Sequence, residues 1–528
     1  MARLTEIKLN FALNIISLLT VSILVGGQKL RAINKQKFIA AAYEHVPIPA
    51  KSICYKEVCK REDALSSMLE NVEIYSEQTL AAKKLGAEMI VFPEFGIVPF
   101  VPRNQIRPFS ERIPPNGESR DEWVPCDATV DSGIEVQKSL SCIAKENKMY
   151  VIANMVDYQP CDECNEDFCL YNTNVIYDKK GRYLAKYHKF NLFNVEFPLF
   201  NIDKEAQNVY ADTELGRLGL IVCEDLLWYY PTDDLVYSSQ VDTVLFSTYW
   251  TDVYPYFLSH ANQASRAKAL QVNFIGSNIH GPLPQNTGSG VYTTEGAINY
   301  YHNVSQNAGG KLVVGELPIH PNKLFIPIQW NQYVNENGAD YPFGGTQFQT
   351  LIHGDLFKMV EMDPEQKRVK ICSSGNDNLC CVTKYNYSRT DIDGTFSLGV
   401  FKGIYHKNES VRGVMVNSLC VIVKCNSETP NLCDSEDYWH SGMSQTYFTT
   451  LELSGNFEPA TSVYPQSVFT EFQLRPELEK VLPDGRMILN LANEGANNAP
   501  FVSMTLFGRR PQDDGPPPEN WCPHEDLY

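Results

Sequence analysis

Apolar and polar residues alternate in the first part of the chain in a way that predicts strands separated by helices. The apolar run KFIAAAYEHV, which starts at Lys37, is typical of a buried strand. Apolar residues at helical spacing then extend from Ala64 to Leu85, and a second apolar run, AEMIVF, ends at Phe92. This order favours βαβ units, so we expect a parallel or mixed sheet with helices on its outside.

The same alternation continues to about Leu317. We expect further helices from Ile134 to Lys145 and from about Pro255 to Leu270, and further strands at MYVIANMV, TNVIYD, YLAKYHK, VDTVLFS and QVNFIGSN. The predicted fold class is therefore α/β.

Beyond about Pro318 the helical periodicity disappears. Short runs such as RVKICS, CCVTKY and VMVNSLCVIVKC alternate with Gly, Asn, Asp and Ser, and cysteines are spread from Cys372 to Cys522. This texture predicts a β-rich region held by disulfides. Because 528 residues exceed what one hydrophobic core usually accommodates, we expect an α/β domain at residues 28–330 and a smaller β-rich domain at residues 331–528.

Residues 1–27 have the pattern of a signal peptide. Two cationic residues precede an apolar run from Phe11 to Val25, which ends in two glycines. The run is short for a membrane span and polar residues interrupt it, so we expect cleavage and a mature chain that begins near Gln28. The Pro-rich end DDGPPPENWCPHEDLY lacks the apolar tail of a lipid-anchor signal. The sequence thus predicts a secreted protein without a membrane anchor.

The formal net charge of the chain is −18 at pH 7. An acidic surface repels nucleic acid and argues against a polybasic membrane-binding patch. We therefore expect neither nucleic acid nor a membrane surface as a partner.

Fifteen cysteines behind a secretory signal indicate disulfides, and the odd count leaves at least one sulfur without a partner in the chain. Cys161 and Cys164 form a C-x-x-C motif, with Cys169 close behind. No second C-x-x-C or histidine pair accompanies the motif, which favours structural disulfides over zinc or redox chemistry. Cys223 and Cys142 are both candidates for an unpaired thiol.

N-glycosylation sequons stand at Asn303, Asn386 and Asn408. Each motif is weak alone, but a secretory route makes each one usable and would mark its segment as surface.

The stretch RLGLIVCEDLLW places Cys223 where a buried strand ends and where we expect an apolar helix to begin. At the carboxyl end of a strand, beside helix N-terminal amides, a thiolate is stabilised and a developing oxyanion finds a donor. Taken alone, a buried structural cysteine is the simpler interpretation. Two other stretches change that interpretation.

Glu94 lies in IVFPEFGIVP, just past a predicted strand, and Lys189 lies in KYHKFNLF among apolar residues. Individually, a solvated loop glutamate and a surface lysine are the simpler interpretations. A lysine in an apolar segment needs a carboxylate to remain charged, however, and Glu94 is a candidate partner.

Together the three stretches resemble the nitrilase, or carbon-nitrogen hydrolase, superfamily, whose sites combine Glu, Lys and Cys in this chain order. The blocks FIAAAYEH, FPEFGI, LSCIAKEN, YNTNVIYD, YHKFNLF, VDTVLF and VNFIGSNIH resemble its vanin and biotinidase branch. The resemblance covers most of the chain up to about residue 317. It implies an αββα sandwich followed by a β-rich C-terminal domain.

The resemblance also implies the chemistry. Glu94 would be the general base and acid, Lys189 the stabiliser of thiolate and oxyanion, and Cys223 the nucleophile that forms a thioester acyl-enzyme. Trp250, soon after VDTVLF, becomes a candidate substrate-binding residue. The implied partner is a small-molecule amide, and no metal or organic cofactor is implied.

The sequence departs from that branch in two places. A Phe is expected after the nucleophile, where this chain has Glu224, and Tyr249 is larger than the small residue expected before Trp250. Because the backbone amide of residue 224 would serve the oxyanion, we expect these departures to affect substrate preference rather than catalysis.

Three functions follow as expectations. Likeness to vanins implies hydrolysis of pantetheine to pantothenate and cysteamine, which we favour. Likeness to biotinidase implies hydrolysis of biocytin or biotinyl peptides. A secreted binding module without turnover is the alternative from another class, since a fold alone does not guarantee chemistry.

Overall fold

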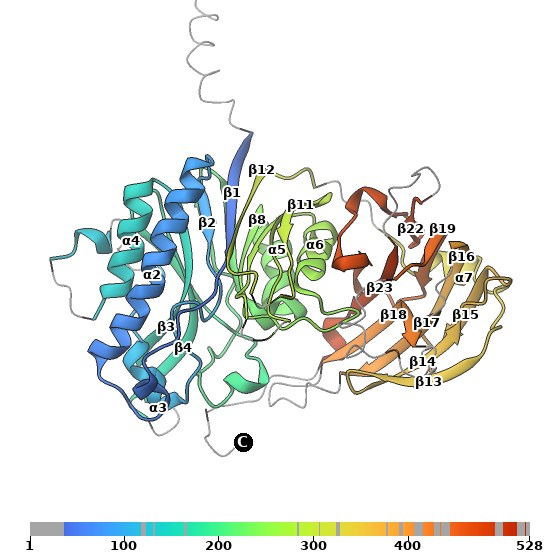
Figure 1. Ribbon diagram of the computed structural model, residues 1–528, viewed down its shortest axis with the longest axis horizontal. Helices are drawn as coiled ribbons and strands as arrows, with labels where there is room; N and C mark the ends of the chain where they lie inside the picture. The colour runs from blue at the N-terminus through green and yellow to red at the C-terminus, as the bar shows by residue number, and fades with distance from the viewer. Residues whose placement is uncertain are drawn as a thin grey trace, which may run out of the picture.

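The computed structural model describes residues 36 to 523, except 118–122, 130–132, 163–165, 282, 284, 306, 324–327, 376–377, 390–393, 406–414, 427–432, 434–443, 492–499 and 515–522. Figure 1 shows four β-sheets in series along the long axis, with helices outside the first sheet and between the second and third.

The first sheet carries two of the segments singled out by the sequence. Its strands, in spatial order, are β12 (Lys311–Pro318), β1 (Lys37–Glu44), β2 (Met89–Val91), β3 (Tyr150–Pro160), β4 (Phe168–Tyr177) and β5 (Tyr183–His188). The three central strands β1, β2 and β3 are parallel, and the outer pairings are antiparallel. The helices α2 (Arg61–Lys84) and α4 (Glu135–Asn147) cover its outer face.

The second sheet carries Cys223. Its strands, in spatial order, are β11 (Gly296–Tyr301), β10 (Ser289–Thr293), β9 (Asn273–Ser277), β8 (Thr243–Ser247), β7 (Gly216–Val222) and β6 (Tyr210–Thr213). The central strands β7, β8 and β9 are parallel. Helices α5 (Asp234–Ser239) and α6 (Ser259–Leu270) lie on its outer side.

The two sheets pack face to face, and the side-chain period of two decides which residues meet. Met89 and Val91 of β2 join the core between the sheets, whereas Ile90 packs under the helices. Two buried serines tie the layers across this core: Ser247 Oγ donates to the Phe92 carbonyl at 2.7 Å and Ser277 Oγ to the Tyr43 carbonyl at 2.6 Å. The αββα sandwich and the α/β class are therefore confirmed.

The chain beyond residue 346 forms two further sheets with their own core between them. One sheet has the order β13 (Gln347–Ile352), β14 (Asp355–Glu361), β17 (Gly394–Ile404), β18 (Val416–Asn426), β23 (Phe501–Arg509) and β20 (Ser462–Phe469). The other has the order β15 (Arg368–Cys372), β16 (Cys380–Arg389), β19 (Tyr447–Gly455), β22 (Met487–Leu489) and β21 (Glu479–Val481). The predicted β-rich C-terminal part is confirmed, and the 330/331 boundary stays a prediction.

Short helices complete the described chain. They are η1 (Ser52–Tyr55), α3 (Arg103–Ile106), η2 (Arg107–Phe109), η3 (Pro125–Asp127), η4 (Asn194–Glu196), η5 (Cys223–Leu227), η6 (Tyr229–Asp233), α7 (Gln332–Glu336), η8 (Thr470–Phe472), η9 (Pro476–Leu478) and η10 (Pro511–Asp513). No helix within the described ranges combines the length and apolar composition that crossing a bilayer requires. The predicted signal peptide, residues 1–27, lies outside the described residues.

Disulfides staple both parts of the chain. The bridges among the described cysteines are Cys54–Cys59, Cys126–Cys142, Cys161–Cys169, Cys372–Cys380, Cys381–Cys420 and Cys425–Cys433. Cys142 is thus paired, which removes it as a candidate free thiol. Cys164 and Cys522 lie outside the described residues, and Cys223 is the free cysteine within them.

Two predicted glycosylation sites fall in the described chain. Asn303 is half-buried just after β11, and its side-chain oxygen accepts the Ser305 amide at 2.9 Å. Asn386 is half-buried on β16, and its side chain donates to Thr449 Oγ1 at 2.8 Å. Asn408 lies outside the described residues.

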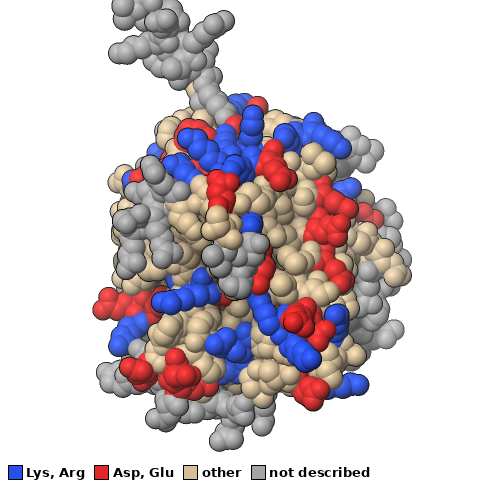
Figure 2. Space-filling view, turned by 90° about the vertical axis from the view of Figure 1, so that its left-hand side faces the viewer, with Lys and Arg blue, Asp and Glu red and all other residues tan. Residues whose placement is uncertain are grey.

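The face covered by α2 and α4 carries both signs of charge. Figure 2 shows Lys and Arg interspersed with Asp and Glu across it. Salt bridges such as Lys145–Asp127 and Lys51–Asp63 belong to this mixture. This side is therefore not uniformly acidic, although the whole chain carries an excess of negative charge.

Buried polar contacts join the α/β part to the C-terminal sheets. Asp233, which is 1% exposed, accepts Tyr464 Oη at 2.5 Å and Ser462 Oγ at 3.0 Å, both from β20. The Arg266 guanidinium of α6 lies 3.2 Å from the centre of the Tyr464 ring and 3.7 Å from the Asp233 carboxylate. This cluster fixes β20 on the outer side of α6.

Replacing Tyr464 by Phe tests that interface. The change removes one donor from a buried carboxylate while keeping the ring under Arg266, so we expect a loss of about 1 to 3 kcal/mol in the free energy of unfolding. Urea unfolding of Tyr464→Phe measures it, with the half-exposed Tyr210→Phe as control. Equal stability of the two variants would contradict a structural role for the Tyr464 hydroxyl.

Candidate active site

The three residues singled out by the sequence come from three strand ends. Glu94 follows β2, Lys189 follows β5 and Cys223 follows β7, so the first sheet supplies two and the second sheet one. All three are buried, with exposed fractions of 1%, 1% and 7%. The face-to-face packing of the sheets brings their charges within mutual electrostatic reach.

Lys189 lies between two carboxylates. Its Nζ donates to Glu94 Oε1 at 2.8 Å and to Glu196 Oε2 at 2.5 Å. Burial by itself lowers the pKa of Lys189, but the electrostatic effects of Cys223, Glu196 and Glu94 outweigh it and hold the pKa well above the usual value. The ammonium therefore stays charged at this site.

Asn172 on β4 holds the two carboxylates in place. Its side-chain nitrogen donates to Glu94 Oε1 and to Glu196 Oε1, each at 2.7 Å. Its side-chain oxygen accepts Asn154 Nδ2 at 2.7 Å, and Asn154 Oδ1 accepts the backbone amide of Phe95 at 3.1 Å. This ladder of amides fixes the turn that carries Glu94.

The backbone of Tyr249 touches both the carboxylate and the thiol. Its amide donates to Glu94 Oε2 at 2.8 Å, and its carbonyl oxygen lies 3.9 Å from Cys223 Sγ. Both contacts use main-chain atoms, so the large side chain that departs from the family pattern does not disturb them.

The backbone at Cys223 adopts the left-handed region, with φ of 45°. A residue with a side chain is strained there, typically by about 1 to 3 kcal/mol, and such strain collects at functional sites. The expected α-helix after Cys223 is wrong: the 3-10 helix η5 follows, then η6, and α5 begins only at Asp234. Pro231, which has no amide proton to continue a helix, stands in this segment.

Asp225 explains how the turn is held. Its buried carboxylate accepts the Val222 amide at 3.1 Å, the Asn191 amide at 2.8 Å and Tyr187 Oη at 2.8 Å. Burial raises the pKa of Asp225 to about 6, although these donors oppose the rise. One side chain thus ties the Cys223 turn to the segment that carries Lys189.

The surroundings of Cys223 do not lower the pKa of its thiol. Burial raises its pKa well above the usual value, the negative charge of Glu94 adds to the rise, and the Lys189 ammonium opposes both. The expected effect of Lys189 is present, but burial outweighs it. A base must therefore take the proton when the thiol reacts.

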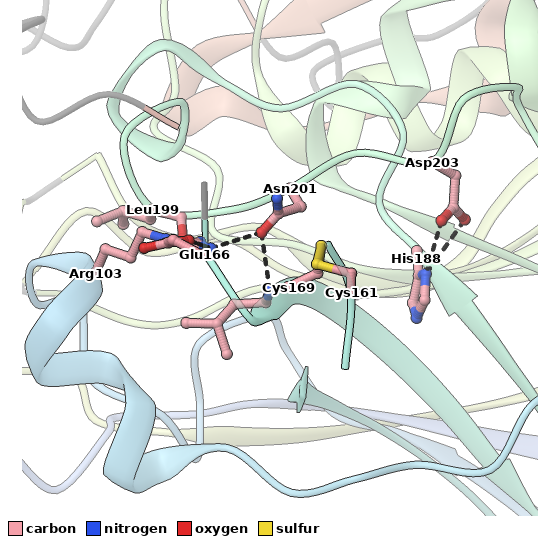
Figure 3. The surroundings of a disulfide bond; sticks show 9 residues. Arg103, Cys161, Glu166, Cys169, His188, Leu199, Asn201 and Asp203 are labelled. Atoms are coloured by element: carbon pink, nitrogen blue, oxygen red, sulfur yellow. Dashed lines mark hydrogen bonds and ion pairs between the residues drawn. A yellow bond between two sulfur atoms is a disulfide. The ribbon is translucent and has the colours of Figure 1, made fainter. Parts of the chain in front are cut away.

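The loop that carries Lys189 and Glu196 is anchored at both ends. Figure 3 shows His188 beside Asp203 at the start and Arg103 beside Asn201 at the end, next to the Cys161–Cys169 disulfide. Arg103 donates to the Leu199 carbonyl at 2.6 Å and to Asn201 Oδ1 at 2.8 Å. These bonds return the loop to β4, where the Leu170 amide also donates to Asn201 Oδ1.

Trp250 is buried and points into the core. Its indole nitrogen donates to the Phe257 carbonyl at 2.7 Å, and its amide donates to Asn278 Oδ1 at 2.8 Å. The indole N–H is therefore already used, and only the ring is left to line a substrate pocket.

Glu224, the residue after the nucleophile, has a strongly raised pKa. Burial raises its pKa to about 8, which the Lys189 charge opposes. Its charge also adds to the rise in the pKa of Tyr405, which comes mainly from burial. Since Tyr405 directly follows β17, the C-terminal part reaches the neighbourhood of the nucleophile turn.

The sequence pointed to Glu94, Lys189 and Cys223, but it missed Glu196, Asn172 and Asp225 as members of the site. Glu196 carried one usable signal, since it is an acidic residue within the apolar segment FNLFNVEFPLF close after Lys189. Asn172 stands inside a strand pattern and gave no signal.

Comparison with known proteins identifies relatives over nearly the whole chain. The sequence pattern of the family described as carbon-nitrogen hydrolase matches residues 56–272, and that described as vanin C-terminal domain matches residues 346–514. Pantetheinase from Mus musculus is 33% identical over 91% of this chain and 90% of its own length. Pantetheinase from Bos taurus is 33% identical over 92% of both chains. Biotinidase from Takifugu rubripes is 28% identical over 89% of this chain and 94% of its own.

The raised thiol pKa predicts how Cys223 reacts with an alkylating reagent. Only the thiolate reacts, so the rate with iodoacetamide should rise about tenfold per pH unit and show no plateau below pH 9. Mass spectrometry of the peptide that contains Cys223 separates this thiol from others, and glutathione is the control. A plateau near pH 7 would contradict the raised pKa.

Glu224 predicts a pH-dependent stability. Its folded pKa of about 8 exceeds its ordinary value of 4.5, so its contribution is full below about pH 4.5 and is lost as the pH rises through 8. Relative to Glu224→Gln, the unmodified protein should lose on the order of 3 kcal/mol between pH 5 and 8. Urea midpoints at both pH values measure this, and the exposed Glu73→Gln is the control. A Glu224→Gln difference that does not change with pH would contradict the prediction.

Proposed function

The chain belongs to the vanin and biotinidase branch of the carbon-nitrogen hydrolase family and is an amidohydrolase acting on C–N bonds other than peptide bonds, and we propose pantetheine as its substrate. The products are then pantothenate and cysteamine. The two pantetheinases support this choice over the biotinidase through their higher identity. Biocytin and biotinyl peptides are the second candidate substrates, since these are also linear secondary amides.

The proposed catalysis begins with the thiol proton. Glu94 takes the proton from Cys223 Sγ as Sγ attacks the amide carbonyl carbon. The tetrahedral oxyanion is stabilised by Lys189 Nζ and the Glu224 backbone amide. Glu94 then protonates the leaving amine as the C–N bond breaks, and a thioester remains on Cys223.

Water completes the cycle. Glu94 removes a proton from a water molecule that attacks the thioester carbonyl, and the acid leaves as the Cys223 thiol is restored. The proton from the Cys223 thiol leaves with the amine, and a proton from the water passes through Glu94 to Cys223 Sγ, so both residues end in their starting protonation states. The chemistry needs no metal or organic cofactor.

One observation carries this mechanism: Glu94 is bonded to Lys189 and to the same Tyr249 backbone that Cys223 Sγ contacts. The base, the cation and the nucleophile are thereby held by one connected set of bonds. The raised pKa of the Cys223 thiol fits the proposed sequence, because the thiol keeps its proton until Glu94 accepts it. Glu196 and Asn172 act as positioning residues for Lys189 and Glu94.

We also propose that the protein is secreted. Six disulfides in the described chain and the signal-peptide pattern of residues 1–27 support secretion. We propose Asn303, Asn386 and Asn408 as glycan acceptors and the ring of Trp250 as part of the substrate pocket. A binding module without turnover is disfavoured, because its site would have no need of a buried cation between two carboxylates.

Replacing Cys223 by Ala tests the nucleophile and the substrate together. We expect release of cysteamine from pantetheine to fall at least ~10³-fold, since the variant lacks the sulfur that attacks the carbonyl carbon. Biocytin hydrolysis is assayed in parallel, and the exposed Ser52→Ala is the matched control. Pantetheine turnover retained in Cys223→Ala would contradict the mechanism, whereas activity on biocytin alone would change only the substrate.

The variant Glu94→Gln separates the base from the nucleophile in the same assay. It should lose turnover to a similar degree while Cys223 stays open to alkylation at high pH. A Glu94→Gln protein with full activity would remove Glu94 from the proposed mechanism.

A further inference from the structure

A second cluster of ionisable groups lies on the outer side of the second sheet. Asp252 follows β8, His260 lies in the first turn of α6, and His302 follows β11. One ligand atom from each residue lies within 4.8 Å of the others. The side chains of Asp252 and His302 are 0% and 3% exposed, and His260 is fully buried. These residues take no part in the proposed catalysis.

His260 is arranged as a metal-binding histidine normally is. Its Nε2 donates to the Phe472 carbonyl at 2.7 Å, so the lone pair of the ring lies on Nδ1. That Nδ1 is buried and has no hydrogen-bond partner within the described part of the chain. Metal-binding histidines usually donate their other ring N–H to a carboxylate, a backbone carbonyl or water, which fixes the tautomer in this way.

The Asp252 carboxylate lacks a permanent counter-charge among the described residues. Its oxygens accept the Ser259 amide at 2.6 Å and His302 Nε2 at 2.8 Å. A cation bound here would supply the missing positive charge.

The hydroxyl of Tyr292 also supports a bound ion. Tyr292 Oη is buried and unpartnered within the described chain. Burial raises the pKa of Tyr292 well above its usual value, and the charges of Tyr300, Glu44 and Asp252 add to the rise. Buried polar atoms without a partner are few in native proteins, and an unplaced ion or water is one usual explanation.

We propose that Asp252, His260 and His302 bind one divalent zinc ion. Two imidazole nitrogens and a carboxylate oxygen are ligands that zinc accepts, and water completes four-coordination. Closing atoms that lie up to 4.8 Å apart onto zinc distances of about 2 Å requires only small side-chain movements. The alternative arrangement, a plain hydrogen-bonded cluster, leaves His260 Nδ1 without a partner.

The ion would join three segments. Asp252 continues the stretch from Tyr249, whose amide holds Glu94. His302 directly precedes the sequon residue Asn303. His260 reaches the C-terminal part through the Phe472 carbonyl. Zinc therefore connects the segment behind the catalytic base to the interface between the two parts, and this inference is independent of the proposed substrate.

The test uses the full secreted protein in the Cys223→Ala background, which removes the free thiol as a competing zinc ligand. The protein is stripped with a chelator, given Zn²⁺, desalted and analysed for zinc per chain. We expect about one zinc per chain and a melting temperature several degrees above that of the stripped protein. Absence of retained zinc in the folded parent would overturn the proposal.

Two near-isosteric variants locate the ion. His260→Gln and Asp252→Asn should each lose the retained zinc and the melting shift, with folding checked by circular dichroism. His280→Gln is the matched control, because His280 is a buried histidine bonded to Glu44 at 2.8 Å outside the cluster. Zinc that persists in both folded cluster variants would overturn the assignment.

Cobalt gives a readout on the parent alone if a variant fails to fold. Co²⁺ in place of zinc should give visible absorption bands from nitrogen and oxygen ligands, and one equivalent of Zn²⁺ should abolish them. Bands that are absent, or that Zn²⁺ does not displace, would contradict the site.

Discussion

The structure of the site depends on one buried cation. Lys189 is almost fully buried, and an unpaired ammonium there would be too costly for the fold to retain. Two carboxylates compensate it, which leaves a net negative charge, and the Asn172 amide takes up part of that charge by donating to both. The cation therefore dictates the positions of Glu94, Glu196 and Asn172. It also requires that the loop between Lys189 and Asn201 be fixed, which Arg103 and the β4 backbone accomplish.

The second requirement is registration of the two sheets. Cys223 stands on the second sheet and its partners on the first, so a slip between sheets would separate them. Ser247 and Ser277 bond across the layers, and Tyr249 presents its amide to Glu94 and its carbonyl to Cys223. These bonds use main-chain atoms on at least one side, so they constrain the backbone itself. The site is a property of the packed sandwich rather than of any single element.

The sequence predicted the strands well because buried parallel strands appear in a sequence as short apolar runs, as in Ala87 to Phe92. It placed Glu94 and Cys223 just past strands for the same reason, whereas the strand before Lys189 is an antiparallel edge strand that the run YLAKYHK indicated. It failed at the helix after Cys223, because the tight turn depends on Asp225 bonding to Tyr187 and Asn191, residues far away in the chain. It also expected a thiolate favoured by its surroundings, but the pKa of Cys223 is governed by burial, which no local pattern reveals. No local pattern indicated Asn172, because its hydrogen bonds to Glu94 and Glu196 form only in the folded protein.

The C-terminal sheets contribute to the nucleophile turn as well as to the overall stability of the fold. The 3-10 helix that begins at Cys223 ends at Leu227. The Leu227 carbonyl accepts a hydrogen bond from Arg509 Nε of β23 at 2.9 Å. Arg509 is itself held by Asp514 and by the Val416 carbonyl, so it is not free to follow the turn. A strained residue such as Cys223 keeps its conformation only when the surrounding structure over-determines it. Asp225 supplies that constraint through its bond to Tyr187 of the first sheet, and Arg509 supplies it from the C-terminal part. The turn therefore persists without an α-helix behind it.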